Sequence, residues 1–315
     1  MEFITNKEEL KAAYSALTVD LSLKSISSFI DAVEYKLRAI LGTDTADKIK
    51  NDPLALESIR KSIANLSLES YSSSGAILIS DSGIHVSKSD KLLPASDKKL
   101  LSFRRDCKER GWTAFEQLIA VIESKTDVFS EWKDSQERKQ YFNTFFYSSV
   151  EFSSFSGSSI SSDLFHILKP HISFVEEDVL EKNFGSELVK YLREKTYEGN
   201  LSIHEKKLLR YFLRITGPLA LVEAIPYRLV QISDAGLYQS AITTSSGTDN
   251  IENFSPVQQR ILNNLMVKLT SSGESSIVTA QKWLNDNIAQ FPLYSEKKIY
   301  PIQNFNEPQE NIYLL

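Results

Sequence analysis

The sequence predicts a mainly α-helical protein made of two tandem copies of a helical-bundle unit, each with a β-hairpin, followed by an extended C-terminal arm. Two observations predict this fold class. Apolar residues recur at the three- and four-residue spacing of amphipathic helices over long stretches, and the same order of predicted elements occurs twice along the 315 residues. We place the first unit at 1–150, the second at 151–295 and the arm at 296–315.

Two amphipathic helices are predicted near the start of the chain. Helical spacing of apolar residues predicts a helix from about Ser22 to Leu41, with Asp20 and Ser22 as candidate caps and Gly42 as a stop. The second helix begins at Pro53, a residue favoured in a first helical turn, and runs to about Tyr71.

A hairpin and a long helix follow. The β-prone segments 76–79 and 84–86 flank Asp81-Ser82-Gly83, which has the composition of a turn. Apolar spacing then predicts a helix over 98–124, in which Gly111 is a position where the helix can bend or break.

This order recurs in the second half of the chain. The amphipathic stretch 164–184 ends at Gly185 as the first ends at Gly42, an offset of 143 residues that pairs Glu34 with Glu177. The next helix is predicted over 203–221.

Two shorter segments support the duplication. Residues 232–237 repeat 79–84 at an offset of 153, and the aromatic turn 291–294 repeats 129–132 at an offset of 162. Serine-rich residues 153–163 suit a linker or a polar loop, so the second copy lacks a clear short helix at its entry.

Composition excludes several classes of protein. The chain is 42% hydrophobic and 24% charged, as in soluble globular proteins, and its one cysteine, Cys107, excludes an internal disulfide. A net charge of −5 argues against a dedicated duplex-DNA binder, and we interpret basic runs such as Lys206-Lys207 as solvated faces. The chain has no signal-peptide pattern and no apolar run of ~18 residues. We expect a protein that is cytosolic when made and binds no membrane.

No pattern of catalysis or cofactor binding is found. Phosphate-binding glycine loops, the GxSxG elbow and HExxH are absent from the sequence. His166 and His171 are five residues apart, so they do not share a helical face and are poor metal ligands. We expect no cofactor and no metal. Glu34 and Glu177 could form a catalytic acid and base, although ion pairing is the more ordinary role for such residues.

The opening of the chain resembles a known family. Residues 4–14 (ITNKEELKAAY) and 23–42 (LKSISSFIDAVEYKLRAILG) resemble the start of tailed-phage head completion, or head-to-tail connector, proteins. The whole arrangement, with the turn Trp132-Lys-Asp-Ser135 and an extended tail, is similar to a duplicated family from phages and prophages of Bacteroides-like bacteria.

This resemblance implies a structural protein of the virion neck, present in the host cytoplasm during assembly. It implies a ring of identical subunits, commonly twelve, that joins the portal protein to the adjacent neck or tail protein without catalysis. Genomic DNA would only pass through its channel. Two alternatives remain: a monomeric helical protein-protein interaction module of unknown partner, and an enzyme that uses Glu34 and Glu177.

We expect the intersubunit contacts on the two hairpins and the arm, because these segments are rich in apolar residues outside the helical stripes. The predicted interface residues are Ile79, Ile84, Val86, Ile232, Leu237, Tyr300, Ile302, Phe305, Ile312, Tyr313 and Leu314.

Overall fold

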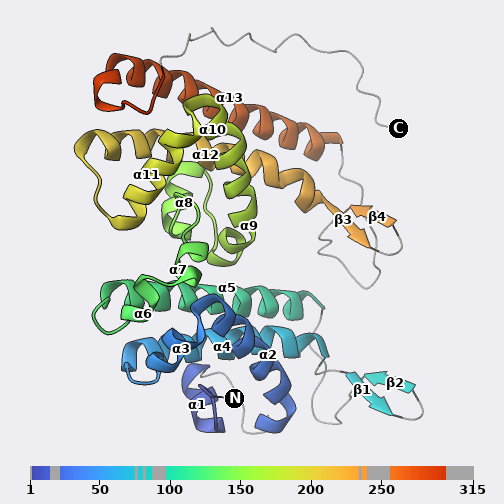
Figure 1. Cartoon of the computed structure of the whole chain (residues 1–315). Helices are drawn as coiled ribbons and strands as arrows, with labels where there is room; N and C mark the ends of the chain where they lie inside the picture. The colour runs from blue at the N-terminus through green and yellow to red at the C-terminus, as the bar shows by residue number, and fades with distance from the viewer. Residues whose placement is uncertain are drawn as a thin grey trace.

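The computed structural model describes residues 2–14, 22–74, 77–80, 83–86, 97–233, 236–239 and 256–295. These residues form a mainly helical molecule, as predicted, in which two helical bundles lie one above the other (Figure 1). Within this part of the chain, no helix is long and apolar enough to cross a bilayer.

The first bundle is built from helices α1 to α7. The predicted helices over 22–41, 53–71 and 98–124 are confirmed as α2, α4 and α5. The Ser22 hydroxyl caps the first turn of α2, and Gly42 ends this helix at a φ of 78°. The bounds are α1 Lys7–Ala13, α2 Leu23–Leu41, α3 Thr43–Ile49, α4 Pro53–Ser74, α5 Asp97–Ser124, α6 Ser130–Lys133 and α7 Gln136–Tyr141.

The second bundle contains the remaining helices. Helix α11 is additional to the sequence prediction, and α12 continues past Leu221, because its buried face extends through Pro218 and includes Ala220 and Ala224. The bounds are α8 Ser149–Ser156, α9 Ser162–Val175, the π-helical turn η1 Glu176–Leu180, α10 Glu181–Phe184, α11 Ser186–Glu198, α12 Ile203–Leu229, α13 Pro256–Asp286 and the 3₁₀ turn η2 Ile288–Gln290.

The prediction of a linker or polar loop at 153–163 is wrong, because much of this segment is helical. The Ser148 hydroxyl accepts the N–H of Glu151 at 3.2 Å, and the Glu151 carboxylate accepts the N–H of Tyr147 at 2.9 Å. The start of α1 has the same capping arrangement, because the Asn6 side chain accepts the N–H of Glu9 at 2.9 Å and the Glu9 carboxylate accepts the N–H of Thr5 at 2.7 Å. Helix α8 is therefore the entry helix of the second unit, equivalent to α1.

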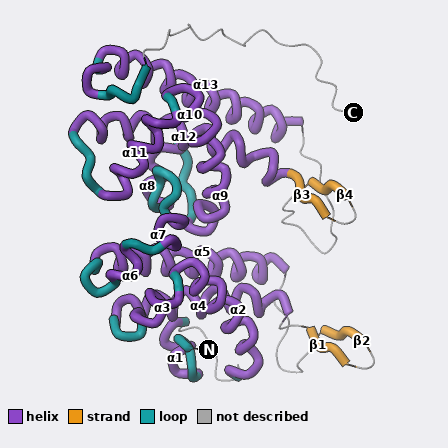
Figure 2. The backbone as a smooth tube through the Cα atoms, viewed as in Figure 1, coloured by secondary structure: helices purple, strands orange, loops and turns teal. Residues whose placement is uncertain are grey.

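The predicted fold class, in which each helical unit includes a β-hairpin, is wrong in this respect. Among the described residues, both bundles and both cores are formed by helices and their connecting loops. Two short antiparallel ladders, β1 (Ile77–Ser80) with β2 (Gly83–Val86) and β3 (Val230–Ser233) with β4 (Gly236–Gln239), lie beside the bundles (Figure 2). A two-stranded ribbon of four-residue strands has too little surface to build a core.

The two bundles bury equivalent positions around separate cores. The first core spans residues from Phe3 to Phe142, and the second spans residues from Phe145 to Tyr294. Equivalent residues are offset by 142 between α2 and α9, by 153 between α4 and α12, and by 162 between α5 and α13. Buried pairs at these offsets are Ile26 and Leu168, Ile30 and Ile172, Ile59 and Phe212, Cys107 and Leu269, Ile122 and Leu284, Phe129 and Phe291, and Trp132 and Tyr294.

The long helices of each bundle meet where a leucine packs on a glycine. A Cβ atom at Gly111 on α5 would lie 2.6 Å from Leu66 Cγ on α4, and one at Gly273 on α13 would lie 2.5 Å from Leu219 Cγ on α12. Helix α5 continues through Gly111 without a break. Glycine at these two positions therefore permits the close approach of the paired helices.

Candidate functional site

Glu34, the first of the two glutamates considered for catalysis, holds the start of the chain. It is buried on α2, where Oε1 accepts the N–H of Phe3 at 3.0 Å and Oε2 accepts the N–H of Glu2 at 2.8 Å. The carboxylate thereby fixes the N-terminal segment over the first core.

The residue equivalent to Glu34 is Glu176, so the predicted pairing with Glu177 is wrong by one position. Glu176 Oε1 accepts the N–H of Phe145 at 2.8 Å, as Glu34 accepts that of Phe3, whereas Glu177 is exposed. The turn η1 is π-helical and inserts one residue. The offset is therefore 142 before this turn and 143 after it.

Glu176 lies wholly within the second core. Arg193 donates to its Oε2 at 3.2 Å. Burial raises the pKa of this carboxyl to about 8, although Arg193 and the N–H of Phe145 favour the ionised form. Glu34 belongs to the first core and Glu176 to the second, so the structure does not assemble the two carboxylates into one acid and base pair.

The two histidines at ligand-like spacing face different neighbours. His166 stacks on Trp112 with ring centroids 3.8 Å apart, and burial lowers the pKa of its imidazole to about 4. His171 lies against Tyr227, with centroids 5.3 Å apart. The part of the chain that the structure describes contains no group of three His, Cys, Asp or Glu side chains placed to hold a metal ion.

A polar network joins the two bundles. Glu116 on α5 accepts the hydroxyl of Ser149 at 2.8 Å and that of Ser162 at 3.2 Å. Lys169 on α9 donates to the carbonyl of Tyr141 at 2.9 Å, and burial lowers the pKa of its ammonium to about 7. These hydrogen bonds connect helix α5 to α8 and α9, and the polar groups of the network satisfy one another.

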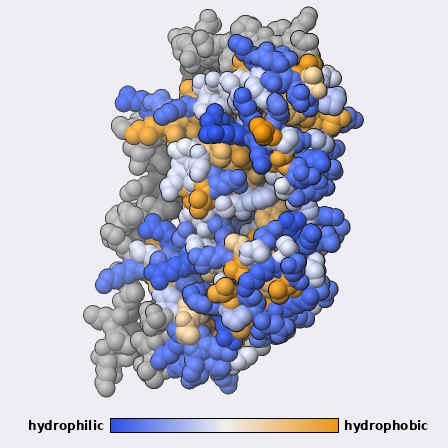
Figure 3. Space-filling model, turned by 90° about the vertical axis from the view of Figure 1, so that its left-hand side faces the viewer, coloured by the Kyte–Doolittle hydropathy of each residue, from blue (hydrophilic) through white to orange (hydrophobic). Residues whose placement is uncertain are grey.

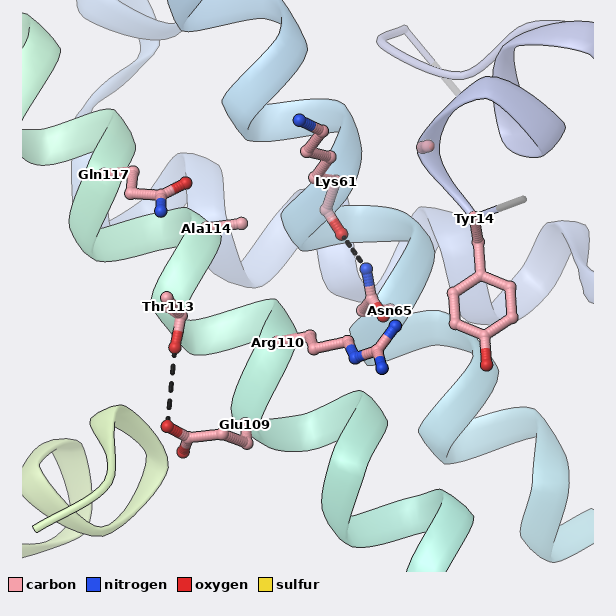
Figure 4. Close-up of a pocket in the computed structure, with 9 residues that line it drawn as sticks. Tyr14, Lys61, Asn65, Glu109, Arg110, Thr113, Ala114 and Gln117 are labelled. Atoms are coloured by element: carbon pink, nitrogen blue, oxygen red, sulfur yellow. Dashed lines mark hydrogen bonds between the residues drawn. The ribbon is translucent and has the colours of Figure 1, made fainter. Parts of the chain in front are cut away.

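A groove between α1, α4 and α5 is the candidate binding site of the first bundle (Figure 4). We call it the first groove. It has a volume of ≈ 330 Å³ and is lined by Ala13, Tyr14, Lys61, Asn65, Glu109, Arg110, Thr113, Ala114 and Gln117.

The cations of the first groove are paired with acids on their own helices. Lys61 bonds to Glu57 at 2.5 Å, and Arg110, which reaches from α5 toward Asn65 in Figure 4, donates to Asp106 at 3.1 Å. Asn65 donates to the carbonyl of Lys61 at 2.8 Å, and its buried Oδ1 accepts no hydrogen bond from the described residues. The first groove is therefore close to neutral, with one free acceptor.

A second groove occupies the equivalent place in the second bundle, between α8, α12 and α13. Its volume is ≈ 390 Å³. At the offset of 153, Arg210 replaces Glu57 and Arg214 replaces Lys61, so the second bundle has two cations at the positions where α4 of the first bundle has an ion pair. The residues that line the second groove are Ser154, Phe155, Arg210, Arg214, Ser272 and Ser276.

The predicted interface residues are not tested by the described side chains. In the hairpins, Ile79 pairs with Ile84 and Ile232 pairs with Leu237 across the strands, but these side chains and that of Val86 lie outside the described part. The residues of the arm also lie outside it, namely Tyr300, Ile302, Phe305, Ile312, Tyr313 and Leu314.

The structure adds an apolar surface that the sequence analysis missed. In the first half of α13, Ile261, Leu265 and Val267 are 62%, 42% and 59% exposed, and Leu262 and Met266 are half-buried. A helix segment that is apolar on several sides is normally covered. The run ILNNLMV contains the signal, since five of its seven residues are apolar without a polar face.

Comparison with known proteins identifies a family for this chain. A family model described as "Family of unknown function (DUF6712)" matches two segments, residues 27–141 and 168–303, which together cover more than half of the chain. The comparisons with curated proteins and with solved structures found no match.

Proposed function

The chain belongs to a family of unknown function (DUF6712), and we propose that it is a structural protein of a bacteriophage neck. In this proposal, copies of the chain form a ring, commonly of twelve, that joins the portal protein to the adjacent neck or tail protein without catalysis. Genomic DNA passes through the channel of the ring. The protein is in the host cytoplasm during assembly and at the virion neck afterwards.

The observation that carries this proposal is the exposed apolar first half of α13. Ile261 and Leu265 lie one helical turn apart and are both well exposed. Large apolar patches on a soluble chain mark protein contacts. A closed ring covers the same patch on every copy, because each subunit offers one surface to the next.

The opening residues support the same proposal. Residues 4–14 and 23–42, which resemble the start of head completion proteins, form α1 and α2. The second unit has an equivalent pair in α8 and α9, with the same capping box and the same buried glutamate. A duplicated subunit of this kind is the arrangement that the resemblance implies.

Light scattering on the purified chain, alone and mixed with the portal protein encoded beside it, tests the proposal. We expect the mass of a ring in at least one of the two samples, or a stable complex with the portal protein. A monomer in both samples would contradict the proposal and favour the monomeric interaction module.

We also propose that the arm, residues 296–315, contributes to association, because its sequence is rich in aromatic and aliphatic residues. A chain that ends at residue 295 should keep its helical circular dichroism signal and lose the complex. A shortened chain that assembles like the full chain would exclude this role for the arm.

A further inference from the structure

The two grooves have the same place in the fold but different charge. We propose that the second groove binds a helical segment of a partner protein through two carboxylates that lie one helical turn apart on that segment. The groove and the basic residues beside it carry this proposal. It does not rest on the neck function, since the binding is a property of the chain alone.

The basic residues form a ridge on α12, made of Lys206, Arg210 and Arg214. They follow one another at four-residue spacing, so neighbouring cations are ~6 Å apart along the helix axis. All three are exposed, and none of their side chains has an ion pair or a hydrogen bond with the part of the chain that the structure describes. The described residues therefore leave three like charges on one face of α12 unpaired.

The first bundle shows that the fold does not require this charge. The positions equivalent to the ridge are Pro53, Glu57 and Lys61, and the latter two form an ion pair at 2.5 Å. The formal charge of the three positions is zero in the first bundle and +3 in the second. The flanking positions that pack into the core are buried in both bundles. The difference is therefore confined to the surface.

The second groove offers the two guanidinium groups and the Ser272 hydroxyl as donors, because the hydroxyls of its other two serines are bonded to backbone carbonyls. The Ser154 hydroxyl donates to the carbonyl of Val150 at 3.0 Å, and the Ser276 hydroxyl donates to that of Ser272 at 2.9 Å. Each arginine offers five N–H donors that match a carboxylate in a bidentate fork. Phe155 is half-buried in the wall and can contact the methylene stems of glutamate side chains.

The spacing favours protein carboxylates over a nucleic-acid backbone. Two glutamates at i and i+4 on a helix are also ~6 Å apart along its axis, which matches Arg210 and Arg214. A phosphate backbone requires a longer track of cations, whereas the ridge is ~12 Å long and the chain has a net charge of −5.

Fluorescence anisotropy with a designed peptide tests the proposal on the full chain. The probe is a fluorescein-labelled, alanine-based helical peptide with two glutamates four residues apart, compared with the same peptide carrying glutamines. We expect the glutamate peptide to bind, and the double variant Arg210→Gln, Arg214→Gln to weaken binding about tenfold or more. The double variant Arg105→Gln, Lys190→Gln removes the same charge from other exposed sites and should leave binding unchanged.

A gain of binding provides an independent check. Glu57→Arg places two cations, at positions 57 and 61, where the second bundle has Arg210 and Arg214, so calorimetric titration should show two peptides per chain instead of one. Three results would overturn the proposal: no binding to the natural chain, equal binding to the Arg210 and Arg214 variant, or displacement of the peptide by inorganic phosphate or a DNA oligonucleotide at equal concentration. Circular dichroism verifies that each variant keeps its helices.

Discussion

Buried glutamates fix the start of each bundle. Glu34 accepts backbone N–H groups of the first residues, and Glu176 accepts the N–H of Phe145 and a bond from Arg193. A backbone donor that loses such a partner in a core costs about 1–3 kcal/mol. A buried glutamate recurs because, in each unit, it holds the extended segment that precedes the entry helix against the first long helix.

Substitution of Glu176 should therefore destabilise the chain much more than substitution of its neighbour. Glu176→Ala leaves the buried N–H of Phe145 without its partner and removes a bond to Arg193, so we expect the free energy of unfolding to fall by about 1–3 kcal/mol. Glu177→Ala is the matched control and should cause no measurable change, because Glu177 is exposed. Urea denaturation of both variants measures the difference. Equal losses would contradict the register assigned through η1.

His166 predicts a pH dependence of stability. Its pKa is about 4 in the folded chain, below the ordinary value of 6.5, so the unfolded chain binds more protons between these values. Stability should accordingly increase as the pH rises from about 4 to 6.5. His166→Phe keeps a ring against Trp112 and removes the titration, so its stability relative to the natural chain should be highest near pH 4. Denaturation at pH 4.5 and pH 8 tests this, and an unchanged difference between the two chains would contradict it.

At the scale of elements, hydrophobic spacing predicted the long helices well. The predicted start of α2 and the predicted end of α5 lie within one residue of the observed bounds, because Ser22 provides a cap and apolar stripes continue to the last turn. Helix α8 was missed because its sequence, SVEFSSFS, is rich in serine, a weak helix former. Its capping box and the buried Phe152 stabilise it through contacts that a single-sequence pattern does not reveal.

Other errors have local causes. Aligning Gly42 with Gly185 gives an offset of 143 residues, which pairs Glu34 with Glu177. The π-helical turn η1 inserts one residue before Gly185, and this insertion cannot be recognised from the glycine positions alone. The correct partner of Glu34 is therefore Glu176. The β-prone segments around 77–86 and 230–239 were assigned to the helical units because local pattern does not tell whether a ribbon joins a core.

The contact between Leu219 and Gly273 gives a test of helix pairing. Gly273→Ala should destabilise the chain by about 1–3 kcal/mol, because its Cβ would overlap the leucine side chain. The double variant with Leu219→Ala provides space, so the two effects should couple by about 1 kcal/mol in thermal or urea denaturation. Ser271→Ala, at an exposed position of α13, is the control for helix propensity. Additive effects in the double variant would contradict this packing.

At the scale of the whole molecule, the described helices form two bundles that bury equivalent positions and have different surfaces. The offsets of 142, 153 and 162 pair buried residues throughout, whereas the groove positions differ in charge. The face shown in Figure 3 is largely hydrophilic with separate apolar patches. The exposed first half of α13 begins on the opposite side, at the right in Figure 1.

The candidate sites were less predictable than the fold. The basic run at Lys206 was visible in the sequence but was interpreted as a solvated face. Its significance depends on the alignment of Arg210 with Glu57, which requires the register of α4 and α12. The apolar run in α13 was not singled out from the sequence, because sequence alone does not show how far α12 covers its partner helix.

Association should depend on the apolar half of α13. The double variant Ile261→Ser, Leu265→Ser replaces two exposed side chains, so we expect little change in unfolding and a large loss of self-association or portal binding in light scattering. Ile203→Ser is the control, because Ile203 is 84% exposed at the start of α12, away from this patch. Equal association of both variants would exclude the first half of α13 as the contact surface.

The most direct test of the neck proposal is electron microscopy of the chain mixed with a candidate portal protein. We expect class averages in which a closed ring of this chain lies on the portal axis, with one copy bound to the next around the ring. Images that contain portal rings alone, with this chain as separate monomers, would contradict it.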